Sequence, residues 1–186
     1  MLDLTIKRAF KVLKLEKNSY REISKDPSAF FQSAIIIILA ALLNIFLFNK
    51  YVNPRLPMEI PLAPLFFLWL FFNWYLFSRI LNYLASIFYF RQSGKKVKYK
   101  ANVALSLVGF SYTAEILKIL IIFSPNFIRV ISWSALMLVA ASQIIGVKEI
   151  YKIEKISTSI GVVILSYIVQ ILFLVGIVIL FSILGS

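Results

Sequence analysis

Five long apolar stretches, separated by charged or proline-containing segments, constrain this chain more than any other feature. They run over residues 28–48, 62–90, 101–123, 127–147 and 159–184. Each is close to or above the roughly 20 apolar residues that a helix needs to cross a bilayer. The bilayer core offers no water to backbone polar groups, so such stretches must close their own hydrogen bonds as helices. The sequence therefore predicts an all-α integral membrane bundle of about five transmembrane helices.

The overall composition argues against a soluble fold. The 186 residues are 61% hydrophobic, whereas soluble domains are about 45–50% apolar. The excess would form large exposed apolar patches in water and drive association. We expect residues 1–26 to form a basic amphipathic cytoplasmic segment and residues 27–186 to form one five-helix transmembrane domain.

The distribution of Lys and Arg predicts the orientation in the membrane. Residues 1–26, 91–100 and 148–155 carry fifteen of them, and the segments that would face the other side carry three. Cytoplasmic loops of membrane proteins are enriched in Lys and Arg. We therefore expect a multi-pass protein with a cytoplasmic N-terminus and, after five crossings, a C-terminus on the opposite side.

The N-terminal segment has an amphipathic pattern. Apolar side chains recur at helical spacing at Leu2, Ile6, Ala9, Phe10 and Leu13. Basic side chains between them cover much of the remaining surface. The pattern favours a helix lying on the inner leaflet. The alternative is that its lysines only fix topology and the helix packs on its own bundle.

A basic cytoplasmic face follows from this orientation, for contact with lipid or with a partner. Its members are Lys7, Arg8, Lys11, Lys14, Arg91, Lys95, Lys96, Lys98 and Lys100. The formal charge of +12 would suggest nucleic acid in a soluble protein. Here the basic residues lie between apolar runs, a pattern typical of contact with anionic lipid headgroups. The expected partner is thus the bilayer and its anionic headgroups, with another membrane protein or a cytoplasmic protein left open, and no nucleic acid.

Charged residues within the predicted spans are the sharpest candidates for a site. Each costs about 2.5–3.5 kcal/mol at the centre of a spanning helix, so each needs a partner or water. Arg79 and Glu115 fall at similar depth, and Lys118 lies three residues after Glu115. We expect Glu115 to pair with Arg79, and Lys118 to be a second partner or to extend outward, with Tyr112 and Asn82 completing the polar cluster. The cluster is interpreted as a structural pair that fixes helix register, or as an ion path or polar ligand cleft.

The chain lacks two residue types that many enzymes need. It contains no Cys and no His, which excludes disulfides, thiolate nucleophiles, Cys/His zinc sites and imidazole acid–base chemistry. We also find no Gly-rich phosphate loop, metal-binding cluster or nucleophile–base pair in the sequence. The prediction is a non-enzymatic protein with no catalytic residues, no metal site and no cofactor.

Several short motifs occur in an order similar to that of a known family. They are the segment 76–84, the turn Gly94-Lys95-Lys96, the pair Gly109-Phe110, Trp133, and the segment 146–151. Over roughly residues 20–184 this order resembles the Yip1 family of multi-pass membrane proteins. The resemblance implies five helices and a cytoplasmic N-terminus. Eukaryotic members of that family are linked to vesicle trafficking and bind prenylated small GTPases.

Three functions are consistent with these observations. The favoured one is an adaptor or organiser in membrane trafficking or membrane-complex assembly, which predicts a sealed bundle with partners at its basic face. A small transporter or channel built around Arg79 and Glu115 predicts a water-filled cleft that touches both charges. An accessory subunit of a larger membrane complex predicts long apolar helix faces buried against another chain.

Overall fold

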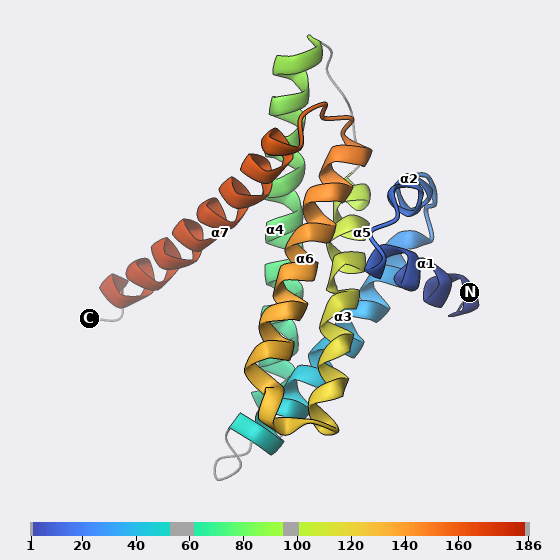
Figure 1. Ribbon diagram of the computed structural model, residues 1–186. Helices are drawn as coiled ribbons and strands as arrows, with labels where there is room; N and C mark the ends of the chain where they lie inside the picture. Colours follow the sequence, from blue (N-terminus) through green and yellow to red (C-terminus); the bar gives the residue numbers. More distant parts are fainter. Residues whose placement is uncertain (1, 53–61, 95–100, 185–186) are drawn as a thin grey trace.

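The computed structural model describes residues 2–52, 62–94 and 101–184 (Figure 1). Their secondary structure is helical, and no strand occurs within these three ranges. The elements are α1 (Leu2–Leu13), α2 (Lys17–Lys25), α3 (Ala29–Leu47), η1 (Phe48–Val52), α4 (Leu62–Ser93), α5 (Ala101–Ser111), η2 (Tyr112–Ile122), η3 (Pro125–Phe127), α6 (Ile128–Ile150) and α7 (Ile156–Leu184). The prediction of an all-α fold is confirmed.

Within the part of the chain that the structure describes, four helical stretches are long and apolar enough to cross a membrane. They are Ala29–Tyr51, Ala101–Ile122, Pro125–Ile150 and Ile156–Leu180. Helix α4 is not among the stretches found over these residues. Its 32 residues would extend about 48 Å, more than a bilayer core requires. The chain is therefore a multi-pass membrane protein, while a fifth crossing by α4 stays a prediction.

Close helix packing forms the centre of the bundle, where α5 and η2 pack against both α3 and α6. The most deeply buried apolar side chains there include Ile37, Leu107, Phe110 and Val147. Gly109 permits the approach of α3, since a Cβ at this position would lie 2.5 Å from the Cβ of Ser33. Small residues at such positions let membrane helices approach closely and gain van der Waals contact.

The helix that begins as α5 changes winding halfway along. Ala101–Ser111 is α-helical, and the next eleven residues, Tyr112–Ile122, form the 3₁₀ helix η2. A 3₁₀ helix has three residues per turn, so side chains at i and i+3 lie directly above one another. This winding aligns Tyr112, Glu115 and Lys118 along one edge of η2.

Helices α1 and α2 fold against the bundle on the side of α3 and α5 (Figure 1). Arg8 forms an ion pair with Asp26 at 2.6 Å and donates a hydrogen bond to Gln32 at 3.0 Å. The Tyr20 hydroxyl lies 3.0 Å from the Ser142 hydroxyl on α6. Two short helices are thereby fixed to the membrane-spanning helices by buried polar contacts.

The faces of α1 differ from the expected arrangement in one respect. Arg8 was expected on the basic face, but it is buried, because Asp26 and Gln32 provide partners for its charge inside the protein. Thr5 and Val12 share this buried face. Phe10, on the predicted apolar face, remains 60% exposed, so α1 packs on the bundle without using that face.

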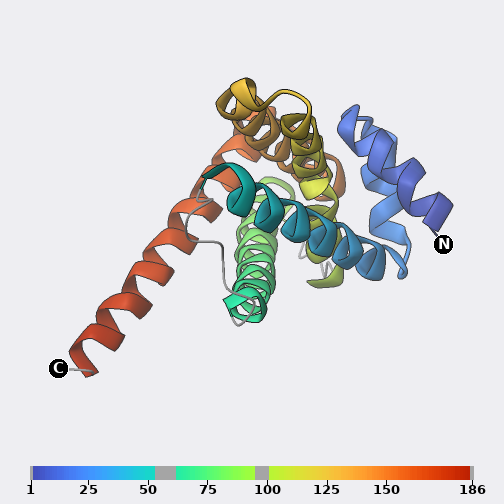
Figure 2. The same cartoon turned by 90° about the horizontal axis from the view of Figure 1, so that it is seen from below.

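Helix α7 diverges from the rest of the bundle. Its N-terminal part packs on α4 and α6 through buried residues that include Val162, Val163 and Ser166. Figures 1 and 2 show its C-terminal part extending away from the other helices. Exposed apolar residues, among them Leu172, Phe173 and Val178, cover that part. Most of the surface of α7 is thus available to lipid or to another chain.

Candidate functional site

A compact polar cluster lies between α3 and η2. The Lys118 ammonium is 2.5 Å from the Glu115 carboxylate. The Asn44 amide joins both, since its nitrogen donates to Glu115 at 3.1 Å and its oxygen accepts from Lys118 at 3.0 Å. The Glu115 and Lys118 side chains are 10% and 16% exposed. The three side chains therefore form a closed, charge-neutral triangle that is largely buried.

The winding of η2 explains why Glu115 and Lys118 meet. In a 3₁₀ helix, residues three apart lie directly one above the other. Asn44 comes from α3, whose sequence is otherwise strongly apolar, and its amide nitrogen also donates to the Ala40 carbonyl at 2.9 Å. An amide can serve a cation and an anion at once, because it carries both a donor and an acceptor.

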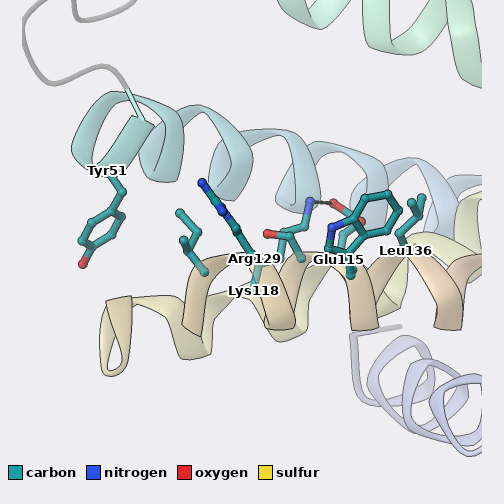
Figure 3. A pocket seen from close by; sticks show the side chains of 8 residues that line it. Tyr51, Glu115, Lys118, Arg129 and Leu136 are labelled. Atoms are coloured by element: carbon teal, nitrogen blue, oxygen red, sulfur yellow. Dashed lines mark ion pairs between the residues drawn. The ribbon is translucent and has the colours of Figure 1, made fainter. Parts of the chain in front are cut away.

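Two cavities adjoin this cluster. The larger, about 650 Å³, lies between η1, η2 and the start of α6 (Figure 3). It is lined by Tyr51, Glu115, Lys118, Ile128, Arg129, Ser132, Trp133 and Leu136. The second, about 440 Å³, lies on the α3 side and shares Glu115, Lys118, Ile128 and Ser132 with the first. Both volumes fall within the range of about 300–1,000 Å³ that is typical of small-molecule sites.

Arg129 adds a second cation to the larger cavity. It is exposed in the first turn of α6 and forms no hydrogen bond or ion pair within the described part of the chain. In Figure 3 its side chain extends toward η1, between Tyr51 and Lys118. The lining of this cavity contains two cations, Lys118 and Arg129, and one anion, Glu115, so its net charge is +1.

The predicted pair of Arg79 and Glu115 is wrong. Arg79 is exposed on α4, where it donates to the Tyr75 hydroxyl at 2.8 Å and its guanidinium lies 5.0 Å from the centre of that ring. Helix α4 directs Trp74, Phe77 and other residues inward instead. Equal depth places two residues at the same level of a bundle but does not decide which way each helix faces.

Of the two other predicted members of the cluster, Tyr112 lies beside Glu115 and Lys118, and Asn82 does not. Tyr112 is half-buried and lines the second cavity together with Glu115 and Lys118. Asn82 lies elsewhere, where its side-chain oxygen accepts a hydrogen bond from Tyr151 at 2.7 Å and ties α4 to the end of α6. Asn44 was not predicted as a member of the cluster, because no sequence signal connects it to Glu115.

The predicted basic face is partly neutralised by local ion pairs. Lys7 pairs with Asp3 at 2.8 Å and Lys11 with Glu22 at 3.2 Å, while Lys14 is exposed. Arg91 is exposed and lines a small cavity of about 240 Å³ near the start of α7. Lys95, Lys96, Lys98 and Lys100 lie outside the described residues.

A second basic region surrounds α2. Arg21 pairs with Glu149 of α6 at 2.7 Å. Together with Lys25 and Lys152 these residues line a cavity of about 550 Å³.

Two titratable groups near α2 have shifted pKa values. Hydrogen bonds from Ser28 and the proximity of Arg8 lower the pKa of Asp26. Burial raises the pKa of Tyr20 to about 12, and the hydrogen bond with Ser142 opposes part of this shift.

Comparison with known proteins adds one result. The family model for the Yip1 domain matches residues 10–179, which is most of the chain and includes α2 and the residues that line both cavities. No curated protein and no solved structure matches. Over the described residues, no group of three or more acidic side chains could hold a metal ion.

Proposed function

Because the chain belongs to the Yip1 family, a family linked to membrane trafficking, we propose that it is a non-enzymatic adaptor. In this proposal the bundle anchors the protein in the bilayer, and partners assemble at its basic cytoplasmic face. The partner would be a cytoplasmic protein or another membrane protein.

The fixed position of α1 and α2 is the observation that supports this proposal. Three contacts hold these helices: Arg8 with Asp26, Tyr20 with Ser142, and Arg21 with Glu149. A surface that is already ordered loses less conformational entropy when it binds a partner. The folded α1–α2 unit, called the platform below, therefore has the rigidity expected of a docking surface.

The exposed side of α1 supports the predicted contact with the inner leaflet. Ile6 and Phe10 are exposed beside Lys7, Lys11 and Lys14. An apolar stripe flanked by lysines inserts shallowly into lipid, while the lysines attract anionic headgroups. Packing through Thr5, Arg8 and Val12 leaves this stripe free. The platform would then lie at the membrane surface, where trafficking partners meet the bilayer.

Site-specific photo-crosslinking in native membranes tests the adaptor function. A photoreactive residue replaces Lys14 or Lys25 on the platform, and the matched control replaces Lys50 at the other end of the bundle. We expect one discrete adduct from the platform positions and none from position 50. The yield should fall when Arg21→Ala removes the contact with Glu149. Identical adducts from both ends, or a yield unaffected by Arg21→Ala, would contradict the proposal.

The polar cavity favours a second candidate, a small transporter. A liposome flux that disappears in Glu115→Gln and persists in Arg79→Gln would support it. Against this candidate, the interior toward α2 is filled by buried side chains that include Val108, Phe110 and Val139. The exposed surface of α7 would suit the third possibility, an accessory subunit, which predicts that α7 crosslinks to a different membrane protein.

A further inference from the structure

We propose that the larger cavity between η1, η2 and α6 binds the phosphate group of an anionic membrane lipid that enters from the side of the bundle. This inference goes beyond the adaptor function and does not depend on it. Arg129 and Lys118 would hold the phosphate, while Trp133 and Leu136 would contact the first part of an acyl chain.

Unused hydrogen-bond donors make the cavity suitable for an anion. An ammonium group has three N–H donors and a guanidinium has five. Lys118 uses its donors on Glu115 and Asn44, which leaves one available. The Arg129 donors meet no hydrogen-bond acceptor within the ranges that the structure describes. Arg recognises phosphate through paired hydrogen bonds, and the net positive charge of the lining favours a ligand with one negative charge.

The start of α6 adds to this preference. The helix dipole makes this end positive, and η3 continues into it, with the Ile128 N–H donating to the Pro125 carbonyl. Arg129 lies in the first turn of α6, and Ser132 follows one turn later and also lines the cavity. Phosphate groups bind at such helix ends in many proteins. Here the helix end acts together with two cationic side chains and a formed cavity.

The apolar wall of the cavity indicates a lipid rather than a soluble anion. Trp133 is 63% exposed and Leu136 is also exposed on the outer surface of α6, yet both line the cavity. The cavity therefore reaches the surface that faces the acyl chains. Lys118 lies four residues before the end of η2 at Ile122, which is about 8 Å at the rise of a 3₁₀ helix. Arg129 lies in the first turn of α6, so both cations are near the same end of the membrane-spanning helices, where lipid headgroups lie.

Fluorescence quenching by brominated lipid tests this inference on the full chain. The protein, carrying Trp69→Phe, is placed in phosphatidylcholine vesicles with a small fraction of phosphatidylglycerol brominated on its acyl chains. Trp74 is buried, so Trp133 reports most of the quenching. We expect stronger quenching by brominated phosphatidylglycerol than by brominated phosphatidylcholine at the same mole fraction. Arg129→Gln should weaken the preference by about tenfold, as expected for the loss of a hydrogen bond to a charged group.

Two further variants separate the site from general surface charge. Lys50→Gln removes a cation from the same end of the bundle but not from the cavity lining, and should leave the preference nearly unchanged. Ser132→Leu fills the cavity without changing any charge, and should abolish the preference. Circular dichroism checks that each variant is folded.

Three results would overturn the inference. The first is equal quenching by the two brominated lipids. The second is an equal loss of the preference in Lys50→Gln and Arg129→Gln, which would assign it to general surface charge. The third is full competition by soluble glycerol phosphate at concentrations comparable to those of the lipid, which would identify a free phosphate ester as the ligand and remove the role of the acyl chain.

Discussion

Replacing Lys118 by Met tests the polar triangle most directly. The substitution removes the ammonium that lies 2.5 Å from Glu115 and leaves the carboxylate with the Asn44 amide at 3.1 Å. Removing one partner of a buried ion pair costs about 3–5 kcal/mol, because the remaining charge stays without compensation. Both side chains retain slight exposure, so we expect a loss near the lower end, about 3 kcal/mol of unfolding free energy.

The double variant Lys118→Met with Glu115→Gln should recover most of this loss. It contains no uncompensated charge, and the new amide can still hydrogen-bond to Asn44. We expect its stability to lie within about 1 kcal/mol of the original protein, which gives a coupling energy of at least about 2 kcal/mol. The assay is reversible unfolding by a denaturing detergent in mixed micelles, followed by circular dichroism.

A second cycle provides the control. Arg79→Leu combined with Glu115→Gln should be additive within about 0.5 kcal/mol, because the two side chains share no partner. Additive effects of Lys118→Met and Glu115→Gln, or strong coupling between Arg79 and Glu115, would refute the arrangement of charges described above.

Three further predictions follow from other contacts. Gly146→Val places a side chain against Leu107 and Tyr20 and should cost about 2 kcal/mol in the same assay, whereas Gly161→Ala, in open space, should be nearly neutral. Since the folded-state pKa of Asp26 is lowered from 3.8, its contribution to stability is complete above that pH and is lost as the pH falls through the folded-state value. A loss of hydrogen-exchange protection in α1 below pH 3.8, measured relative to the intrinsic exchange rate at each pH, would show this, and Asp26→Asn should lower the protection of α1 above that pH as well. Phe10→Ser should weaken the contact of α1 with anionic vesicles, measured by the blue shift of a dye attached at position 14, and an unchanged shift would argue against an interfacial α1.

The membrane-spanning helices could be predicted because the length of an apolar stretch is a local property of the sequence. The direction in which each helix faces is not local. The predicted pairing of Arg79 with Glu115 used their expected depth alone, whereas Trp74 and Phe77 face inward on α4 and Arg79 is exposed. The role of Asn44 depends on α3 lying beside η2, and no spacing within either segment reveals that contact.

For the N-terminal helix too, the sequence pattern does not reveal which face packs on the bundle. Its apolar stripe is evident from the sequence, and in the structure Phe10 remains exposed as an interfacial helix requires. The face that packs on the bundle carries Arg8, a residue that a sequence pattern assigns to the surface. Its partners Asp26 and Gln32 follow in later parts of the chain, so the burial of this charge could only be seen once the helices were assembled.

The tight winding of η2 also sets the length of its membrane span. Eleven residues extend about 22 Å as a 3₁₀ helix but only about 16 Å as an α-helix. Rewinding would turn Lys118 by about 60° relative to Glu115, since three residues complete a full turn in one geometry and five-sixths of a turn in the other. Any force that shortens this segment, such as a thinner bilayer, would therefore also separate its two opposite charges. In this chain the same eleven residues therefore determine both how far the segment extends through the bilayer and whether the ion pair of Glu115 and Lys118 can form.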